Sequence, residues 1–266
     1  MFSKPKSLLL CAGLGSRLGV LTECWPKCLM PVGGRPLLEY WLGTLYANGI
    51  EDVLVNLHHH ADKVRRFLDR EQFRSWVDVS YEKQLLGTAG TLYANARRYE
   101  LEPVLLIHAD NWCLCNFEEF IRFHSLYRPA HTALSMMTFR TSNPSSCGIV
   151  DIDHEGVVQA MVEKPERPLH NLANGAVYMV EPEVVAWIKK NPNVKDFSTE
   201  VLPQFFGRIA TWENVFPHRD IGTIESLCAA QSDPIPPCVW PEADWWSREF
   251  LSNEIHNKIL NISSHL

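Results

Sequence analysis

A short stretch near the start of the chain, residues 8–31, most constrains the fold. It reads LLLCAGLGSRLGVLTECWPKCLMP, an apolar run followed by glycines, an arginine and a Pro-Lys pair. The apolar run predicts a buried strand that opens into a glycine-rich turn. Gly13 and Gly15 allow the main chain to approach a ligand closely, and Arg17 and Lys27 supply two cations just behind the turn. The stretch therefore predicts a site for the phosphates of a nucleotide.

Strand and helix patterns alternate over roughly the first 180 residues. The predicted strands of this part lie at 8–12, 52–57, 77–81, 104–107 and 132–139. The predicted helices between them lie at 36–48, 61–68, 88–96 and 116–124. Such alternation is typical of α/β proteins in which helices cover a largely parallel sheet.

The pattern changes after residue 145. Runs broken by Gly, Asp and Pro predict short strands at 148–153, 156–163 and 175–180, and a helix follows over 181–190. From residue 232 the chain becomes rich in proline and tryptophan, and apolar spacing predicts one amphipathic helix over 247–262. We expect its tryptophans to pack on the main domain rather than to form a sugar platform or an interface.

Composition excludes several classes of partner. The net charge of −6 argues against nucleic acid, whose phosphates require a basic face, but a few local cations suffice for a nucleotide. No run of about 18 apolar residues is present, so we expect no membrane span. Eight cysteines without CxxC pairs predict free thiols in a reducing cytoplasm. A homo-oligomer is compatible with all of this.

Four further segments carry residues suited to phosphate chemistry. LLGTAGTL at 85–92 predicts a second glycine turn that opens a helix, and Asp110 follows the end of a predicted strand. VEKP at 162–165 and HRDIGT at 218–223, which includes Asp220, come later. Because loops at the carboxyl ends of parallel strands share one crevice, we expect these segments to meet.

Together the segments resemble the sugar-1-phosphate nucleotidyltransferase family over about residues 6–230. The family signature is G-x-G-T-R followed by P-K, and this chain keeps the spacing from Arg17 to Lys27, with Ser16 in place of the usual threonine. LGTAG, the aspartate, EKP, NGAVY and DIGT follow in the family order. The chain departs at residues 107–110, which read IHAD where many members read N-G-D.

The resemblance implies a fold and a domain arrangement. The fold is a Rossmann-like three-layer α/β sandwich with a mixed, mostly parallel central sheet, of the nucleotide-diphospho-sugar transferase type. We expect a catalytic domain over 1–231 and a Pro/Trp-rich extension over 232–266, without the hexapeptide-repeat domain of longer relatives.

The resemblance also implies an activity: a nucleoside triphosphate and a sugar 1-phosphate give a nucleotide sugar and pyrophosphate. Arg17 and Lys27 would be catalytic, and Asp110 and Asp220 would bind Mg²⁺. The implied nucleotide contacts are Leu10, Ala12, Gly13, Gly15, Ser16, Glu82, Gly87 and Thr88. The implied sugar-phosphate contacts are Asn111, Gly148, Glu163, Lys164, Asn174 and Gly175.

Glu82 bears on the choice of base. A carboxylate only accepts hydrogen bonds, and guanine offers the two donors N1–H and N2–H₂, whereas uracil and thymine offer one. The sequence therefore favours GTP, unless Glu82 is a solvated residue at a strand end. A mannose-type or manno-heptose-type sugar is favoured, and a thymidylyl- or uridylyltransferase acting on glucose 1-phosphate or another sugar 1-phosphate is the alternative.

Two other functions and one metal cluster are disfavoured. An NAD(P)-dependent oxidoreductase needs a continuous helix and an acidic residue that closes the second strand, but Pro26 and Pro31 interrupt the stretch and that strand ends Asn-Leu-His at 56–58. A non-catalytic nucleotide-sugar sensor would usually lack the lysine or the aspartates, which are present here. The histidines at 58–60 have no carboxylate or cysteine near them in sequence, so a solvated loop is favoured over a metal site.

Overall fold

The computed structural model of the chain describes residues 4–240 and 243–263, and these fold as two compact units. The first unit contains residues 4–8, 86–107 and 115–216. The second contains residues 9–85, 108–114 and the described part of 217–266. Strand β1 (Lys6–Leu10) passes from the first unit into the second.

The first unit is built on a sheet whose strands adjoin in the order β10-β9-β11-β6, with β8 beside β11 and β12 beside β8. The strands are β6 (Val104–His108), β8 (Leu134–Arg140), β9 (Gly148–Ile152), β10 (Val158–Glu163), β11 (Leu172–Val180) and β12 (Ile209–Glu213). The pairs that β11 makes with β6, β8 and β9 are antiparallel, as is β9 with β10, whereas β12 runs parallel to β8.

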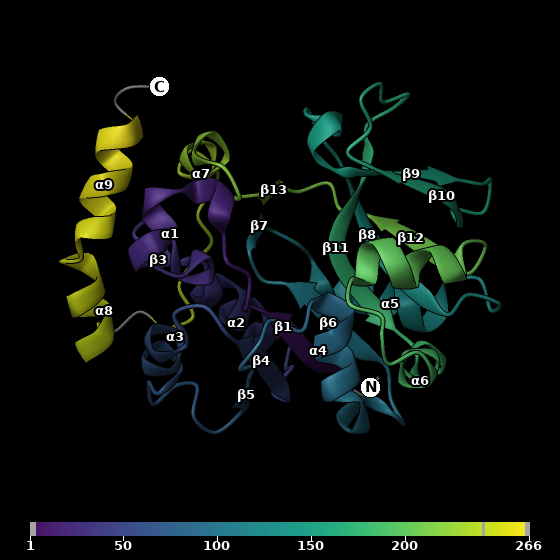
Figure 1. Cartoon of the computed structure of the whole chain (residues 1–266), viewed down its shortest axis with the longest axis horizontal. Helices are drawn as coiled ribbons and strands as arrows, with labels where there is room; N and C mark the ends of the chain where they lie inside the picture. The colour runs from purple at the N-terminus through teal and green to yellow at the C-terminus, as the bar shows by residue number, and fades with distance from the viewer. Residues whose placement is uncertain (1–3, 241–242, 264–266) are drawn as a thin grey trace. The chain divides into compact units, whose positions relative to one another are not determined.

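Figure 1 shows helices α4 (Thr88–Ala94), α5 (Phe117–Leu126) and α6 (Pro182–Lys190) beside the strands of this sheet. The unit also contains the 3₁₀ turns Ala96–Tyr99, Pro144–Ser146 and Leu202–Phe205, and a π turn at Phe197–Val201. Each long helix has a reason to begin where it does. Asn116 caps α5 by accepting from the amide of Glu119, and Pro182 occupies the first turn of α6, where its missing amide proton costs nothing.

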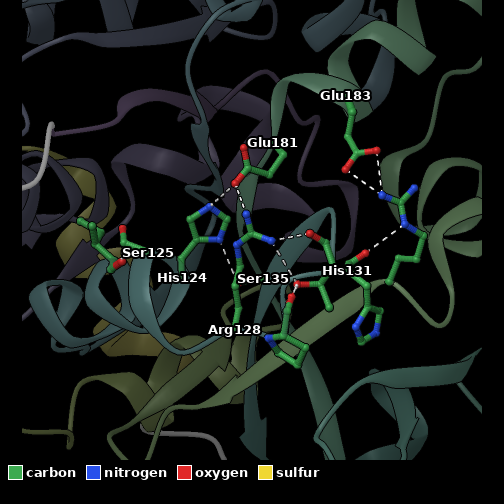
Figure 2. A network of polar contacts seen from close by, with 11 residues as sticks. His124, Ser125, Arg128, His131, Ser135, Glu181 and Glu183 are labelled. Atoms are coloured by element: carbon green, nitrogen blue, oxygen red, sulfur yellow. Dashed lines mark hydrogen bonds and ion pairs between the residues drawn. The ribbon is translucent and has the colours of Figure 1, made fainter.

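A polar network joins α5, β8 and the start of α6 (Figure 2). The buried His124 places Nδ1 2.9 Å from Oγ of Ser135 and Nε2 3.2 Å from Oε1 of Glu181. Arg128 donates to the same Glu181 carboxylate. Buried polar groups are tolerated when they are bonded in this way, so the network fixes α5 against the sheet.

The second unit holds three small groups of paired strands. They are the parallel pair β4 (Val53–Leu57) with β5 (Val77–Tyr81), and the antiparallel pairs β7 (Asn111–Cys113) with β13 (His218–Asp220) and β2 (Pro31–Val32) with β3 (Arg35–Pro36). Its helices are α1 (Val20–Cys24), α2 (Leu37–Ala47), α3 (Ala61–Leu68), α7 (Ile224–Ala230), α8 (Trp245–Leu251), α9 (Glu254–Ser263) and the 3₁₀ turns Ser16–Leu18 and Lys27–Leu29.

The C-terminal segment belongs to the second unit and packs on the earlier part of that unit through its aromatic rings. Trp240 stacks on Trp76 with centroids 6.4 Å apart, and Phe250 stacks on Trp25 at 5.8 Å. Figure 1 shows α9 running alongside α1, which it contacts. The predicted packing of the tryptophan-rich segment is confirmed.

The single helix predicted over 247–262 is wrong. The chain forms two helices, α8 and α9, separated at Ser252 and Asn253. Asn253 accepts a hydrogen bond from the amide of Ile255, so a side chain that competes for backbone amides starts a new helix here.

The other predicted elements agree with the structure, and the α/β class with a mixed sheet is confirmed. The predictions over 61–68 and 77–81 match α3 and β5 to the residue, and most others shift by one to three residues at an end. Among the described residues, no helix is long and apolar enough to cross a membrane.

Candidate functional site

Lys27 lies at the centre of a charged cluster in the second unit. Its side chain is only 4% exposed, and Nζ donates to Oδ2 of Asp110 and to Oδ1 of Asp220, both at 2.8 Å. Asp110 stands between β6 and β7, and Asp220 ends β13. Because β13 pairs with β7 so that Asp220 faces Asn111, the two aspartates meet despite the long chain between them.

Arg17 joins this cluster from the glycine turn. Its Nη2 donates to Oδ2 of Asp220 at 2.7 Å, and its side chain is 53% exposed. Gly222 lies against the same groups, since an ideal Cβ there would stand 2.6 Å from Nη2 of Arg17 and 2.8 Å from Oδ1 of Asp220. The fold thus brings together the four side chains that we predicted to act together: Arg17, Lys27, Asp110 and Asp220.

The mutual contacts set the charge states of the cluster. Burial alone would lower the pKa of the Lys27 ammonium, but the charges of Asp110 and Asp220 raise that pKa above its ordinary value. Burial would raise the pKa of Asp220, but Lys27 and Arg17 lower it overall. For Arg17, burial is likewise outweighed by Asp220, and the pKa of its guanidinium is raised. The cations stay charged and Asp220 stays ionised at neutral pH.

The two glycines of the first glycine turn differ: the backbone and packing require a glycine at residue 15 but not at residue 13. Gly15 has φ +65°, and an ideal Cβ there would lie 2.8 Å from Cγ2 of Thr22. The hydroxyl of Thr22 lies 3.1 Å from the carbonyl oxygens of Gly15 and Gly19 and ties the turn to α1. At Gly13 an ideal Cβ meets no described atom within 4 Å. The space above Gly13 is therefore open.

Other predicted nucleotide and sugar-phosphate residues of the second unit lie within a few residues of Arg17 or Asp110 in the chain. Leu10 accepts from the amide of Ala109 at 3.2 Å, which joins the end of β1 to the residue before Asp110. Ala12 is buried and Ser16 begins the 3₁₀ turn that carries Arg17. The carbonyl of Asn111 accepts from Nε1 of Trp41 at 2.9 Å.

Glu82 is buried, which excludes the alternative of a solvated residue at a strand end. Its side chain is 3% exposed, and Oε1 accepts from Nδ2 of Asn56 at 2.8 Å. Oδ1 of Asn56 in turn accepts from the amide of Cys11 at 2.7 Å. Asn56 was not among the predicted site residues, although an asparagine inside the apolar run VLVNL is a usable signal.

The histidine loop is also not the solvated loop that was expected. Nε2 of His59 and Nε2 of His60 each lie 3.0 Å from the carbonyl oxygen of Thr22, and Nδ1 of His58 lies 2.9 Å from that of Glu82. The imidazoles serve as hydrogen-bonding groups for the main chain of neighbouring segments.

The second glycine turn belongs to the first unit and is bonded to its own surroundings. Gly87 has φ +80°, and an ideal Cβ there would lie 2.5 Å from the carbonyl oxygen of Lys195. The same oxygen accepts from the amide of Ala89 at 2.8 Å, and Oγ1 of Thr88 accepts from the amide of Phe197 at 2.6 Å. The fold alone thus accounts for the glycine at 87.

The predicted sugar-phosphate residues of the first unit form a second group. An ideal Cβ on Gly148 would lie 2.8 Å from Oε2 of Glu163, its partner across β9 and β10. Lys164 has φ +47°, and its exposed Nζ lies 3.8 Å from Oε1 of Glu163. Gly148 and Asn174 both approach the sulfur of Met161.

Asn174 and Gly175 lie where the register of β11 against β8 shifts. Oδ1 of Asn174 accepts from the amide of Ala176 at 2.9 Å, and Nδ2 donates to the hydroxyl of Tyr178 at 2.7 Å. Ala176 has φ +54°, so the side chain of Asn174 stabilises an irregular segment that a strand would not otherwise contain.

Among the described residues, no group of three or more His, Cys, Asp or Glu side chains is arranged to hold a metal. Asp110 and Asp220 nevertheless converge on one cation, the ammonium of Lys27. Two carboxylates completed by phosphate oxygens and water are the donor set that Mg²⁺ commonly takes, so the residues present fit that ion.

A family model described as nucleotidyl transferase matches residues 6–234. The chain belongs to this nucleotidyl transferase family. A mannose-1-phosphate guanylyltransferase catalytic subunit beta from Xenopus tropicalis is 30% identical over 204 residues, which is 74% of this chain and 55% of the relative. The protein of the same name from Drosophila melanogaster is 28% identical, over 75% of this chain and 54% of the relative. The chain spans about half the length of the curated relatives it matches.

Among solved structures, this chain resembles HddC from Yersinia pseudotuberculosis complexed with GMP-PN. The TM-score is 0.72 at 25% identity, over 85% of this chain and 98% of that chain. This likeness supports the α/β fold described above.

Proposed function

We propose that this nucleotidyl transferase moves a nucleotidyl group, preferably GMP, from a nucleoside triphosphate to a sugar 1-phosphate, and releases pyrophosphate. The observation that carries the proposal is the convergence of Lys27 and Arg17 on Asp110 and Asp220. Two cations and two carboxylates at one point, beside an open glycine turn, suit reactants that are both polyanions.

The reaction mainly requires that the protein neutralise the phosphate charges and align the two reactants. The attacking group is a phosphate oxygen that is already ionised at pH 7, so the reaction needs no general base. Lys27 would bridge the α-phosphate and the incoming sugar phosphate, where a buried ammonium acts strongly because the local dielectric is low. Arg17, exposed and able to turn, would hold the β- and γ-phosphates of the leaving pyrophosphate.

Asp110 and Asp220 would hold Mg²⁺, which would supply further positive charge to the phosphate oxygens when bound. Lys27 and Arg17 form ion pairs with these carboxylates. Phosphate groups would compete for the same cations and so free the aspartates for the metal.

The preference for GTP is supported by Glu82 and by the relatives. A buried carboxylate is an acceptor suited to the two donors of guanine. The curated relatives are named guanylyltransferases, and the HddC structure is described as complexed with GMP-PN. Leu10, Ala12, Gly13, Gly15, Ser16, Gly87 and Thr88 complete the proposed nucleotide contacts.

The sugar is proposed to be mannose 1-phosphate, with a manno-heptose 1-phosphate as the next candidate. The names of the curated relatives support mannose. The proposed sugar-phosphate contacts are Asn111, Gly148, Glu163, Lys164, Asn174 and Gly175. We propose that residues 1–231 form the catalytic domain and residues 232–266 an extension.

A pyrophosphate-release assay tests the proposal. GTP, ATP, dTTP and UTP are each combined with mannose 1-phosphate, a manno-heptose 1-phosphate and glucose 1-phosphate in the presence of Mg²⁺. We expect GTP with a manno-configured sugar phosphate to give the highest kcat/KM. Highest turnover with dTTP or UTP on glucose 1-phosphate would instead support the alternative specificity, and no release from any pair would reject the activity.

Variants of the cluster test the assigned roles in the same assay. Asp110→Asn and Asp220→Asn should abolish release, and Lys27→Met should lower kcat by at least about a hundredfold, as loss of a group that stabilises transition-state charge does. Glu213→Gln, which breaks an exposed pair with Arg140, is the control and should keep wild-type activity. Turnover at the wild-type rate by either aspartate variant would reject the metal assignment.

A further inference from the structure

Asn56 links two parts of the proposed nucleotide site. It is the one polar residue of β4, a strand whose five residues are all buried, and its side chain is 3% exposed. Its Oδ1 accepts from the main-chain amide of Cys11 at 2.7 Å, and its Nδ2 donates to Oε1 of Glu82 at 2.8 Å. One amide therefore connects the start of the glycine turn to the buried carboxylate.

The orientation of this amide is determined by its partners. The amide of Cys11 can only donate, so the oxygen of Asn56 must face it. The nitrogen of Asn56 must then face Glu82, and it carries the proton that an ionised carboxylate requires. An aspartate has nearly the same shape but could satisfy only the first of these two contacts.

Glu82 depends on that donor. Burying a carboxylate is costly unless its oxygens accept hydrogen bonds, and the N–H donor of Asn56 at 2.8 Å fixes the direction of the Glu82 carboxylate. The ionised form is the one that accepts from both N1–H and N2–H₂ of guanine.

We propose that Asn56 is a positioning residue for base selection. Its amide orients the Glu82 carboxylate as an acceptor for guanine and holds that carboxylate at a fixed place relative to Cys11, at the start of the glycine turn. The inference rests on the function proposed above and adds a residue that does not itself contact the nucleotide. It implies that the selectivity for GTP depends on the direction of one buried amide.

The test compares GTP with inosine triphosphate (ITP), whose base keeps N1–H but lacks the 2-amino group. Wild-type protein should prefer GTP by about ten- to hundredfold in kcat/KM, the value of a hydrogen bond to a charged acceptor. Asn56→Asp should bring the GTP:ITP ratio close to one, because two adjacent buried carboxylates share a proton and Glu82 ceases to be an oriented anion. The change should lie in KM for GTP, with kcat nearly unchanged.

Asn214→Asp is the matched control, because Asn214 is equally buried, at 2%, and is not part of the proposed site. It should keep the wild-type GTP:ITP ratio whatever it does to the melting temperature. A folded Asn56→Asp protein with the wild-type ratio would overturn the inference.

A double variant, Asn56→Asp with Glu82→Gln, separates positioning from support of the fold. The new glutamine can donate to the new aspartate, so the pair is bonded again and the melting temperature should recover. The GTP:ITP ratio should stay several-fold below the wild-type value, because a neutral amide is a weaker acceptor than a carboxylate. Recovery of the ratio together with stability would overturn the inference. This variant also carries the test if Asn56→Asp alone does not fold.

The proposed function and the inference fail in different ways. Wild-type protein that releases no pyrophosphate from any triphosphate would reject the proposed function. Wild-type protein that prefers GTP over ITP, combined with an Asn56→Asp variant that does so equally, would leave the proposed function in place and reject the role of Asn56.

Discussion

Gly222 lies directly against the guanidinium of Arg17: an ideal Cβ at residue 222 would stand 2.6 Å from Nη2 and 2.7 Å from Cζ of that side chain. Gly222 follows Asp220 by two residues, and Asp220 binds the same guanidinium. The glycine therefore leaves room for Arg17 at the place where the two aspartates and Lys27 meet.

Gly222→Ala should displace Arg17 without unfolding the protein, because the crowded atoms belong to the flexible end of a side chain. We expect KM for the triphosphate to rise and kcat/KM to fall by about ten- to hundredfold, as loss of a charged hydrogen bond predicts. Gly43→Ala in α2, where the nearest atom is Cγ2 of Val239 at 3.2 Å, is the control and should leave KM unchanged. Wild-type kinetics in Gly222→Ala would mean that the position of Arg17 is not important for binding.

Gly13 and Gly15 should respond differently to a methyl group. At Gly15, φ is +65° and Cγ2 of Thr22 is 2.8 Å from the ideal Cβ, so Gly15→Ala should lower the free energy of unfolding by about 1 kcal/mol or more. At Gly13 the space is open and φ lies outside the left-handed region, so Gly13→Ala should unfold like wild type. If phosphates approach the main chain at Gly13, Gly13→Ala should still weaken nucleotide binding by at least about tenfold.

Urea unfolding and calorimetric titration with a non-hydrolysable triphosphate measure these two effects separately. Normal stability with weakened binding in Gly13→Ala would identify Gly13 as a residue required by the ligand rather than by the fold. Tight binding by that variant would place the phosphates elsewhere.

The sequence predicted the elements of the site better than the connections between them. Periodicity located the strands that precede the first glycine turn and Asp110, because such patterns are local. Lys27 and Asp220 were found from the short motifs that contain them, and strand β13, which ends at Asp220, was not predicted. The contacts of Asn56 with Cys11 and Glu82 join residues 45 and 26 positions apart, and nothing local in the sequence encodes such pairs. The sequence marks Asn56 as unusual only because it is a polar residue within an apolar strand.

Hydrogen bonds from side chains to the main chain account for the other differences. Asn253 caps α9 and so divides a helix that apolar spacing alone predicts as continuous. The histidines at 58–60 bond to carbonyl groups of Thr22 and Glu82, which distant parts of the chain supply. In both cases a side chain satisfies backbone groups, which hydrophobic patterning does not reveal.

A buried ion cluster around Arg70 should support the C-terminal segment. The side chain of Arg70 is 2% exposed and bonds to Glu39 in α2 and to Asp244 just before α8. Arg70→Met leaves two carboxylates without their cation, so the free energy of unfolding should fall by about 3–5 kcal/mol. Arg66 of α3 forms an exposed pair with Glu249 of α8, and Arg66→Met, which breaks that pair, should cost at most about 1 kcal/mol.

Urea titration followed by tryptophan fluorescence reports both variants, because Trp246 packs against Phe67, on the same helix as Arg66. Equal losses in the two variants would contradict a special role for the buried cluster and would assign the effect to lost packing of the arginine stem.

The network of Figure 2 predicts a pH dependence of stability in the first unit. The hydrogen bond from His124 lowers the pKa of Glu181 most, burial opposes it, and Arg128 lowers it further, so the pKa lies below its ordinary value of 4.5. A carboxyl group with a depressed pKa stabilises the fold above its unfolded pKa, and this contribution is lost as the pH falls through the folded value. Glu181→Gln should therefore destabilise the protein by about 1–3 kcal/mol at pH 7.

The deficit of Glu181→Gln should shrink as the pH falls below about 4.5, where the wild-type carboxylate is itself becoming protonated. Glu183→Gln is the control, since that glutamate lies two residues away and forms an exposed pair with Arg208. Its effect should stay below about 1 kcal/mol at every pH. Unfolding curves in urea at pH 7, 5 and 4 measure both variants. A deficit of Glu181→Gln that stays constant with pH would mean that the charge of Glu181 does not stabilise α5 against the sheet.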